Sequence, residues 1–315
     1  YPNIITVVNE TFADIKVLGD FKTNEDYMPY FHSLKKNCVT GYTYASIVGG
    51  QTANTEFELL TGNTLGFLSA GTTAFQLYIH GQMPSLVSNL KAEGYSGNKA
   101  MHPFNPYNYN RPAVYKDFGF TDFIDKFDFP KNVKRVREYI SDEANVDRII
   151  SEYEKNRKKT DQPFYMYNMT IQNHSPYDKD AANFKQPIKI ESSKYDAEAN
   201  RYLNLIKYSD DSLKQLTSYF EKCKEPTIIL FLGDHQPRLT DEFMNKITNG
   251  QYQTWSSEQM MKRYQVPFVI WANYDIKEQH IEKTSMNYIQ SILTKTAGVK
   301  MTGYQRFLNE VRKEV

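Results

Sequence analysis

The chain has 315 residues, 40% of them hydrophobic and 24% charged, a balance typical of a globular protein with a sizeable core. Its net charge of +1, from 38 basic and 37 acidic residues, argues against a dedicated nucleic-acid binder, which would carry a clear basic excess. We therefore expect no nucleic-acid partner. No run of about 18 apolar residues occurs, so no membrane span is predicted within these residues.

Short apolar runs predict six strands, and amphipathic stretches between them predict helices. The expected strands are 3–8, 38–43, 96–101, 164–170, 227–232 and 266–271. The expected helices are 28–37, 52–61, 85–92, 142–158, 198–223 and 286–297. This alternation predicts a mainly parallel sheet covered by helices on both faces. Since the chain enters its first core strand at once, we also expect further sequence upstream.

Polar residues directly follow three of the predicted strands. Glu10 follows the first strand, His174 follows the fourth, and Asp234 and His235 follow the fifth. Because ligands bind beyond the carboxyl ends of such strands, these side chains are expected at one edge of the sheet. Taken singly, Asp234 could cap a turn and Glu10 could lie at the surface. Together, two carboxylates and an imidazole suit Mn²⁺, Mg²⁺ or Zn²⁺.

The segment 49–58 (GGQTANTEFE) places Thr52 after two glycines, at the start of a predicted helix. Backbone N–H groups at a helix start favour an anion such as phosphate. One interpretation is that Thr52 is a helix cap, with Thr55 or Glu56 completing a capping box. The other is that Thr52 binds a cation, which lowers the pKa of its hydroxyl and turns it into a nucleophile.

These motifs, taken in order, resemble those of the lipoteichoic acid synthase family, within the alkaline phosphatase and sulfatase superfamily. They comprise Glu10, Thr52 in its segment, Asn-His-x-Pro-Tyr at 173–177 and Gly-Asp-His at 233–235. The match runs from Pro2 to at least Leu239. The resemblance implies a three-layer α/β/α alkaline phosphatase/sulfatase-like fold. Residues 1–240 would form the main catalytic core, and 241–315 a smaller C-terminal α+β part of the same domain.

The resemblance also implies one divalent cation, with Mn²⁺ preferred to Mg²⁺ or Zn²⁺, and a pocket for phosphate and glycerol. The implied metal ligands are Glu10, Thr52, Asp234 and His235, with Thr52 also the nucleophile. The implied substrate-binding residues are His102, Tyr109, Arg111 and His174. Tyr109 stands where the family usually has Trp, which is a departure in the glycerol-binding part of the pocket.

By the same resemblance, the donor is phosphatidylglycerol and the acceptor a polyglycerolphosphate chain or a cell-wall glycan. Thr52 would attack the phosphorus, Arg111 would neutralise phosphate oxygens, and His174 would protonate the leaving diacylglycerol. The expected location is the extracellular face of a Gram-positive-type cell membrane, held by an N-terminal anchor outside these residues.

Two other functions remain open at this point. A phosphoethanolamine transferase of the same superfamily would also use a Thr nucleophile, but that branch usually carries several disulfides. A catalytically silent glycan-binding member is the other alternative. True sulfatase activity is not expected, because neither Cys38 nor Cys223 lies in the required Cys/Ser-x-Pro-x-Arg context. Whether these two cysteines pair is left open.

Residues outside these motifs are given structural interpretations. His32, His80 and His280 are expected to be structural or exposed to solvent. The basic run 131–137 (KNVKRVR) is expected to form a solvated helix face, with a surface for anionic lipid or polyphosphate as the alternative.

Overall fold

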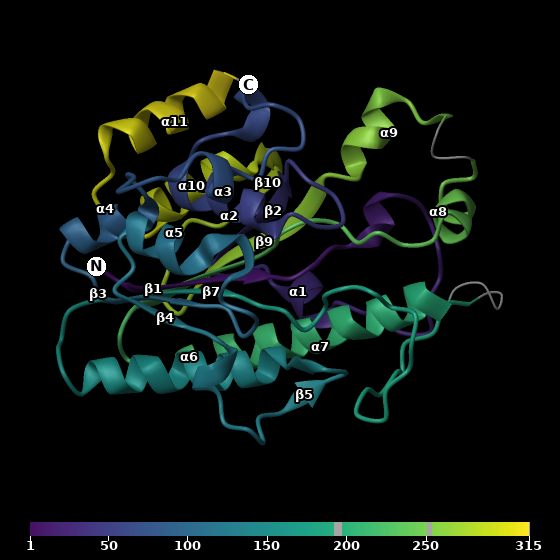
Figure 1. The fold of residues 1–315 in the computed structure, drawn as a ribbon, viewed down its shortest axis with the longest axis horizontal. Helices are drawn as coiled ribbons and strands as arrows, with labels where there is room; N and C mark the ends of the chain where they lie inside the picture. The colour runs from purple at the N-terminus through teal and green to yellow at the C-terminus, as the bar shows by residue number, and fades with distance from the viewer. Residues whose placement is uncertain (192–196, 251–253, 315) are drawn as a thin grey trace.

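An eight-stranded sheet runs through the centre of the protein (Figure 1). The computed structural model describes residues 1–191, 197–250 and 254–314. The strand order across the sheet is β10-β2-β9-β8-β1-β7-β3-β4. The strands are β1 (Asn3–Asn9), β2 (Cys38–Tyr44), β3 (Ser96–Met101), β4 (Asp122–Ile124), β7 (Phe164–Met169), β8 (Thr227–Gly233), β9 (Gln265–Ala272) and β10 (Gln279–Ser285).

Strands β1, β7 and β8 end at the same level of the sheet, which brings the residues that follow them together. β9 is antiparallel to both of its neighbours, and the other pairings in the sheet are parallel. Val8 of β1 pairs with Met169 of β7 on one side and with Leu232 of β8 on the other. The residues that follow these three strands therefore leave the sheet at the same edge.

Both faces of the sheet are buried under helices. On β1, Ile5 and Val7 belong to one apolar core, whereas Ile4 and Val8 belong to a second one across the sheet. In Figure 1, α6 and α7 lie below the sheet, and α2, α4, α5, α10 and α11 lie above it. The helices are α1 (Pro29–Ser33), α2 (Thr52–Thr61), α3 (Ala74–Leu77), α4 (Leu86–Ala92), α5 (Arg111–Phe118), α6 (Asp142–Arg157), α7 (Ala197–Phe220), α8 (Asp241–Ile247), α9 (Ser257–Lys262), α10 (Met286–Thr296) and α11 (Gly303–Glu314). The predicted three-layer α/β/α architecture is confirmed.

The six predicted strands are all present, and each agrees with its predicted bounds to within one residue at either end. The helix predicted over 28–37 is much shorter, because Leu34 is already extended and Asn37 has a positive φ of 52°. The two cysteines are free, so the open question of a disulfide is answered. No helix within the described ranges is long and apolar enough to cross a membrane.

The basic run 131–137 does not form the helix face that its charge pattern predicted. It contains β5 (Arg135–Val136), which forms a two-stranded hairpin with β6 (Tyr139–Ile140). Arg137 sits at the turn with a φ of 54°, and its side chain is buried rather than solvated. The prediction was wrong because the carbonyls that bind this guanidinium belong to a distant loop.

Both β9 and β10 come from the part of the chain after residue 240, yet they are hydrogen-bonded within the central sheet. The division at residue 240 into a core and a C-terminal part stays a prediction.

Candidate active site

A pocket of about 310 Å³ opens at the carboxyl edge of the sheet, where β1, β7 and β8 end. Seven of the eight residues that the sequence assigned to the site line this pocket. They are Glu10, Thr52, His102, Tyr109, Arg111, His174 and His235. The eighth, Asp234, is fully buried and hydrogen-bonded to Thr52. The structure therefore brings together groups from five separate regions of the chain.

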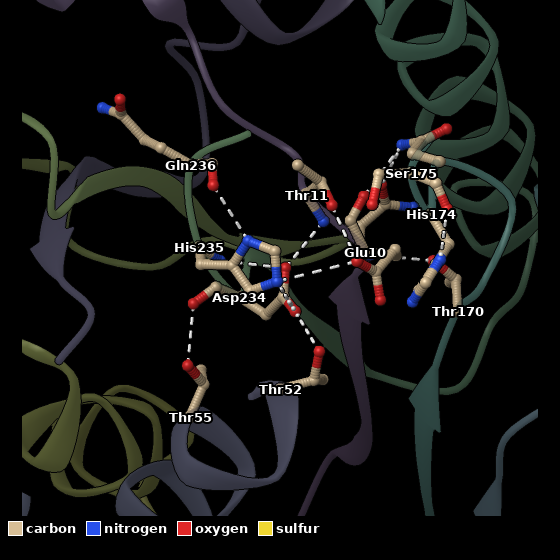
Figure 2. Close-up of polar contacts among 12 residues, drawn as sticks. Glu10, Thr11, Thr52, Thr55, Thr170, His174, Ser175, Asp234, His235 and Gln236 are labelled. Carbon is tan, nitrogen blue, oxygen red and sulfur yellow. Dashed lines mark hydrogen bonds and ion pairs between the residues drawn. The ribbon is translucent and has the colours of Figure 1, made fainter. Parts of the chain in front are cut away.

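Glu10, Asp234 and His235 form a tight buried cluster (Figure 2). One possible ligand atom from each lies within 4.8 Å of the others. His235 Nε2 is 3.2 Å from Asp234 Oδ2 and 3.7 Å from Glu10 Oε1. Its Nδ1 donates to the carbonyl of Gln236 at 3.0 Å, which leaves the Nε2 lone pair on the side of the carboxylates. The imidazole is thus oriented as a metal-binding histidine would be.

The electrostatics of this cluster suit a cation. Burial raises the pKa of Asp234 to about 6, and the nearby Glu10 carboxylate adds to the rise against the opposing effect of His235. Burial opposes charge on His235, but Asp234 and Glu10 outweigh it and raise the pKa of the imidazole. Two crowded carboxylates and one imidazole nitrogen are hard ligands that divalent cations accept. The residues present therefore fit a divalent metal ion.

Thr52 is placed beside the cluster by two contacts at the start of α2. Its Oγ1 donates to Asp234 Oδ2 at 2.8 Å, and Thr55 Oγ1 donates to the Asp234 carbonyl at 2.7 Å (Figure 2). The residue at the N-cap is Gln51, in the left-handed region at a φ of 64° and without a side-chain cap. The capping-box interpretation is therefore wrong, because Thr52 lies inside the first turn and its hydroxyl is turned to Asp234.

Arg111 lies at the first position of α5 and is almost completely buried. Its Nε and Nη2 donate to Glu56 Oε1 at 3.1 and 2.7 Å, and its guanidinium lies 5.2 Å from the centre of the Tyr109 ring. Burial opposes the charge, but Glu56 outweighs it and raises the pKa of Arg111. A fixed, permanently charged guanidinium at the pocket wall can bind phosphate oxygens.

The two pocket histidines differ in environment. His102 is buried, and its Nδ1 donates to the Met169 carbonyl at 3.0 Å. Burial and the Arg111 charge hold the pKa of His102 well below its usual range, so this imidazole is neutral. His174 is exposed, and its Nδ1 donates to the Ser175 carbonyl at 2.7 Å, which leaves Nε2 available. Of the two histidines, His174 is thus the one whose ring is accessible from solvent.

Sequence reasoning missed three residues that shape the site. Arg238 lines the pocket four residues after Asp234, and its closeness to the Gly-Asp-His motif was the signal that could have found it. Glu56 was assigned to a capping box, and Arg137 to a solvated surface. His32, His80 and His280 do not line this pocket, in keeping with the structural interpretation given to them.

The fold and the site define a member of the alkaline phosphatase superfamily. The chain matches the Sulfatase family over residues 2–299, and it belongs to that family. It is 32% identical over 318 residues to a putative cyclic beta-1,2-glucan modification protein of Rhizobium meliloti, covering 98% of the chain and 48% of that protein. The chain thus spans about half the length of this curated relative.

Two solved structures have the same fold. The phosphoglycerol transferase GacH of Streptococcus pyogenes, in complex with sn-glycerol-1-phosphate, superposes with a TM-score of 0.83 at 20% identity, over 100% of this chain and 79% of that one. The lipoteichoic acid synthase LtaP of Listeria monocytogenes gives a TM-score of 0.76 at 23% identity, over 96% and 73% of the two chains. At these identities the likeness establishes the fold.

Proposed function

We propose that this chain is the catalytic part of a metal-dependent phosphoglycerol transferase. It moves glycerol phosphate from phosphatidylglycerol to an acceptor hydroxyl through a covalent intermediate on Thr52. The observation that carries the proposal is the contact of Thr52 Oγ1 with Asp234 Oδ2, beside the Glu10–Asp234–His235 cluster and in the pocket that holds Arg111. The named functions of the relatives support the same class of reaction.

The cation would be held by Glu10, Thr52, Asp234 and His235, with Mn²⁺ expected and Mg²⁺ or Zn²⁺ as alternatives. When bound, the cation would lower the pKa of the Thr52 hydroxyl and place positive charge beside the phosphate oxygens.

The side chains of the pocket divide the remaining work between binding and proton transfer. Arg111 binds a phosphate oxygen, because it is a fixed cation at the pocket wall. In the first half-reaction Thr52 Oγ1 bonds to phosphorus and loses its proton to solvent, and His174 protonates the departing diacylglycerol oxygen. In the second, the acceptor oxygen replaces Thr52 on phosphorus, His174 takes the acceptor proton, and Thr52 regains a proton from solvent.

For the acceptor, we favour an envelope glycan over a glycerophosphate chain. The support is the relative named for glucan modification, which is more similar in sequence than the lipoteichoic acid synthase structure. The enzyme would act at the outer face of a membrane, anchored by a segment outside these residues. The free cysteines give no support to the phosphoethanolamine alternative, whose members usually carry disulfides.

The test is incubation of the purified protein and Mn²⁺ with fluorescent phosphatidylglycerol. We expect release of diacylglycerol, and we expect Thr52→Ala to lower it by about 1,000-fold or more, because the nucleophile is gone. Thr52→Ser keeps a hydroxyl and should retain part of the activity. An intact mass spectrum of the native protein should show one glycerophosphoryl adduct. Native-rate release by Thr52→Ala would overturn the proposal, and turnover of phosphatidylethanolamine alone would favour the alternative donor.

A further inference from the structure

A second cavity, of about 220 Å³, lies against the first, and the two share Gln51 in their walls. Its lining comes from residues 46–47 after β2, from the start of α2, and from the segment 65–72 that follows the helix. We call this cavity the neutral cleft. Gln51 directly precedes Thr52, so a ligand that contacts Gln51 in the neutral cleft would lie next to the proposed nucleophile.

None of the described residues that line the neutral cleft has a charged side chain. Hydroxyl and amide groups alternate there with small and aliphatic side chains. Asn54 is already committed, since it donates to the Thr72 carbonyl at 2.7 Å and accepts from the Ala74 N–H. Within the described ranges the Ser69 hydroxyl makes no hydrogen bond, and Gln51 has only a long contact of 3.4 Å from Asn54. These two side chains remain available to a polar, uncharged ligand.

The part of the main pocket lined by Arg238, which lies against Gly49, is different in character. There Arg238 is shared with a third cavity of about 310 Å³, whose lining also includes Asp241 and Arg263. The catalytic pocket thus has a charged neighbour across Arg238 and an uncharged neighbour across Gln51. An anionic polymer placed in the neutral cleft would give up hydration without gaining a cation, which is unfavourable.

An exposed aromatic residue lies between two lining residues of the neutral cleft in the sequence. Phe67 is 92% exposed and lies in the short helical turn η2 (Leu65–Phe67), between the lining residues Gly66 and Leu68. Its side chain is therefore free to contact a ligand that enters from solvent. A phenyl ring offers a flat apolar surface to the C–H face of a sugar ring, while the hydroxyl and amide groups beside it can bind sugar hydroxyls.

We propose that the neutral cleft is the acceptor subsite and that it holds an uncharged glycan. This inference rests on the proposed function. One sugar hydroxyl would reach past Gln51, its oxygen would bond to phosphorus as the bond from phosphorus to Thr52 Oγ1 breaks, and its proton would pass to His174. Phe67 would stack on a sugar ring, and Ser69 and Gln51 would bind its hydroxyls.

Filling the neutral cleft tests this proposal. Ala70 is exposed and lines the cleft, so Ala70→Trp adds bulk there without entering the core. Two quantities are measured, namely diacylglycerol release without acceptor and glycerophosphate transfer to a neutral cyclic glucan. We expect Ala70→Trp and Phe67→Ala each to lower transfer by at least about tenfold while release stays within about twofold of native. Phe307→Ala on α11, also an exposed aromatic, is the matched control and should change neither quantity.

The remaining outcomes separate this inference from the proposed function. Native protein that never releases diacylglycerol refutes the proposed function itself. Native protein that transfers to a glycerophosphate oligomer but not to the glucan overturns the neutral-glycan assignment alone. Transfer to glucan at native rate by Ala70→Trp, or an equal loss of release and transfer, likewise overturns the neutral cleft as the acceptor subsite.

Discussion

Glu56 is a residue with no direct part in the proposed reaction, and yet it fixes the cation that would bind the phosphate. It is completely buried one turn after Thr52 on α2. Its Oε1 accepts from Arg111, and its Oε2 accepts from the hydroxyls of Tyr115 and Tyr167. A single helix thus carries both the proposed nucleophile, Thr52, and the anchor of Arg111, so the distance between them is set by helix geometry.

Replacing Glu56 by Gln should therefore impair both activity and stability. The change leaves Arg111 as a buried charge without its partner, which lowers the free energy of unfolding by about 3 kcal/mol. We expect the KM for phosphatidylglycerol to rise by about tenfold or more, measured at equal folded fraction by circular dichroism. Glu152→Gln is the matched control, because Glu152 is also buried and pairs with Lys99, and neither residue lines the pocket. Unchanged kinetics in Glu56→Gln would contradict a positioning role.

At the residue scale, the sequence predicted which residues lie in the site better than it predicted the side chains that they contact. Glu10, Thr52 and Asp234 were predicted because each follows a strand or begins a helix, which are local features. Arg111 was placed in the pocket by the resemblance, but its burial depends on Glu56, which lies 55 positions away and is not visible in a local pattern. A capping box was the local explanation for Glu56, and the tertiary ion pair overrides it.

His174 lies in the loop after β7, and the β5–β6 hairpin binds the backbone of this loop. Arg137 of the hairpin donates to the carbonyls of Gln172 at 2.9 Å, His174 at 2.7 Å and Pro176 at 2.7 Å. Its guanidinium also lies 5.3 Å from the centre of the Tyr139 ring. One side chain thus fixes the backbone on both sides of the proposed proton donor.

Arg137→Lys should loosen this loop while keeping its charge, because an ammonium group cannot span three carbonyls as a guanidinium does. We expect kcat to fall by about tenfold with little change in KM, since the proposed mechanism uses His174 in the chemical steps. Arg135→Lys is the control, because Arg135 is exposed and donates to the Glu138 carbonyl within its own hairpin. Equal kinetics for the two variants would show that Arg137 does not position His174.

Two strands that the sequence did not predict, β10 and β4, lack an apolar run. β10 (QHIEKTS) is an edge strand with mostly exposed side chains, and β4 has three residues, so neither produces an apolar run. The buried central strands do produce such runs, because helices cover both of their faces. Prediction thus succeeded at the centre of the sheet and failed at its edges.

For the whole molecule, the carboxylate–imidazole cluster joins the ends of β1 and β8 to the start of α2. A cation bound there should stabilise the fold, since it binds the native state and leaves the unfolded chain without a preformed site. At about 100 times its dissociation constant, Mn²⁺ should add about 2.7 kcal/mol. That gain corresponds to a rise in Tm of about 4 °C for a protein of this size.

The measurement is a thermal melt of the chelator-treated protein with and without Mn²⁺, Mg²⁺ or Zn²⁺. Asp234→Asn removes a carboxylate from the cluster and should abolish the increase in Tm. Glu225→Gln, which alters a half-exposed carboxylate away from the pocket, should preserve it. No increase in Tm with any of the three ions would contradict the metal site.

The place of β1 in the sheet has a consequence for how the protein forms. β1 is the first strand of the described chain to leave the ribosome, but its two neighbours, β7 and β8, are made much later, since Ile4 pairs with Tyr165 and Ile228. Until then an apolar strand lies open along both edges, which invites aggregation. Such distant pairings also make folding slow. The two open edges of β1 are thus covered only late in assembly, a topological feature that the finished fold conceals.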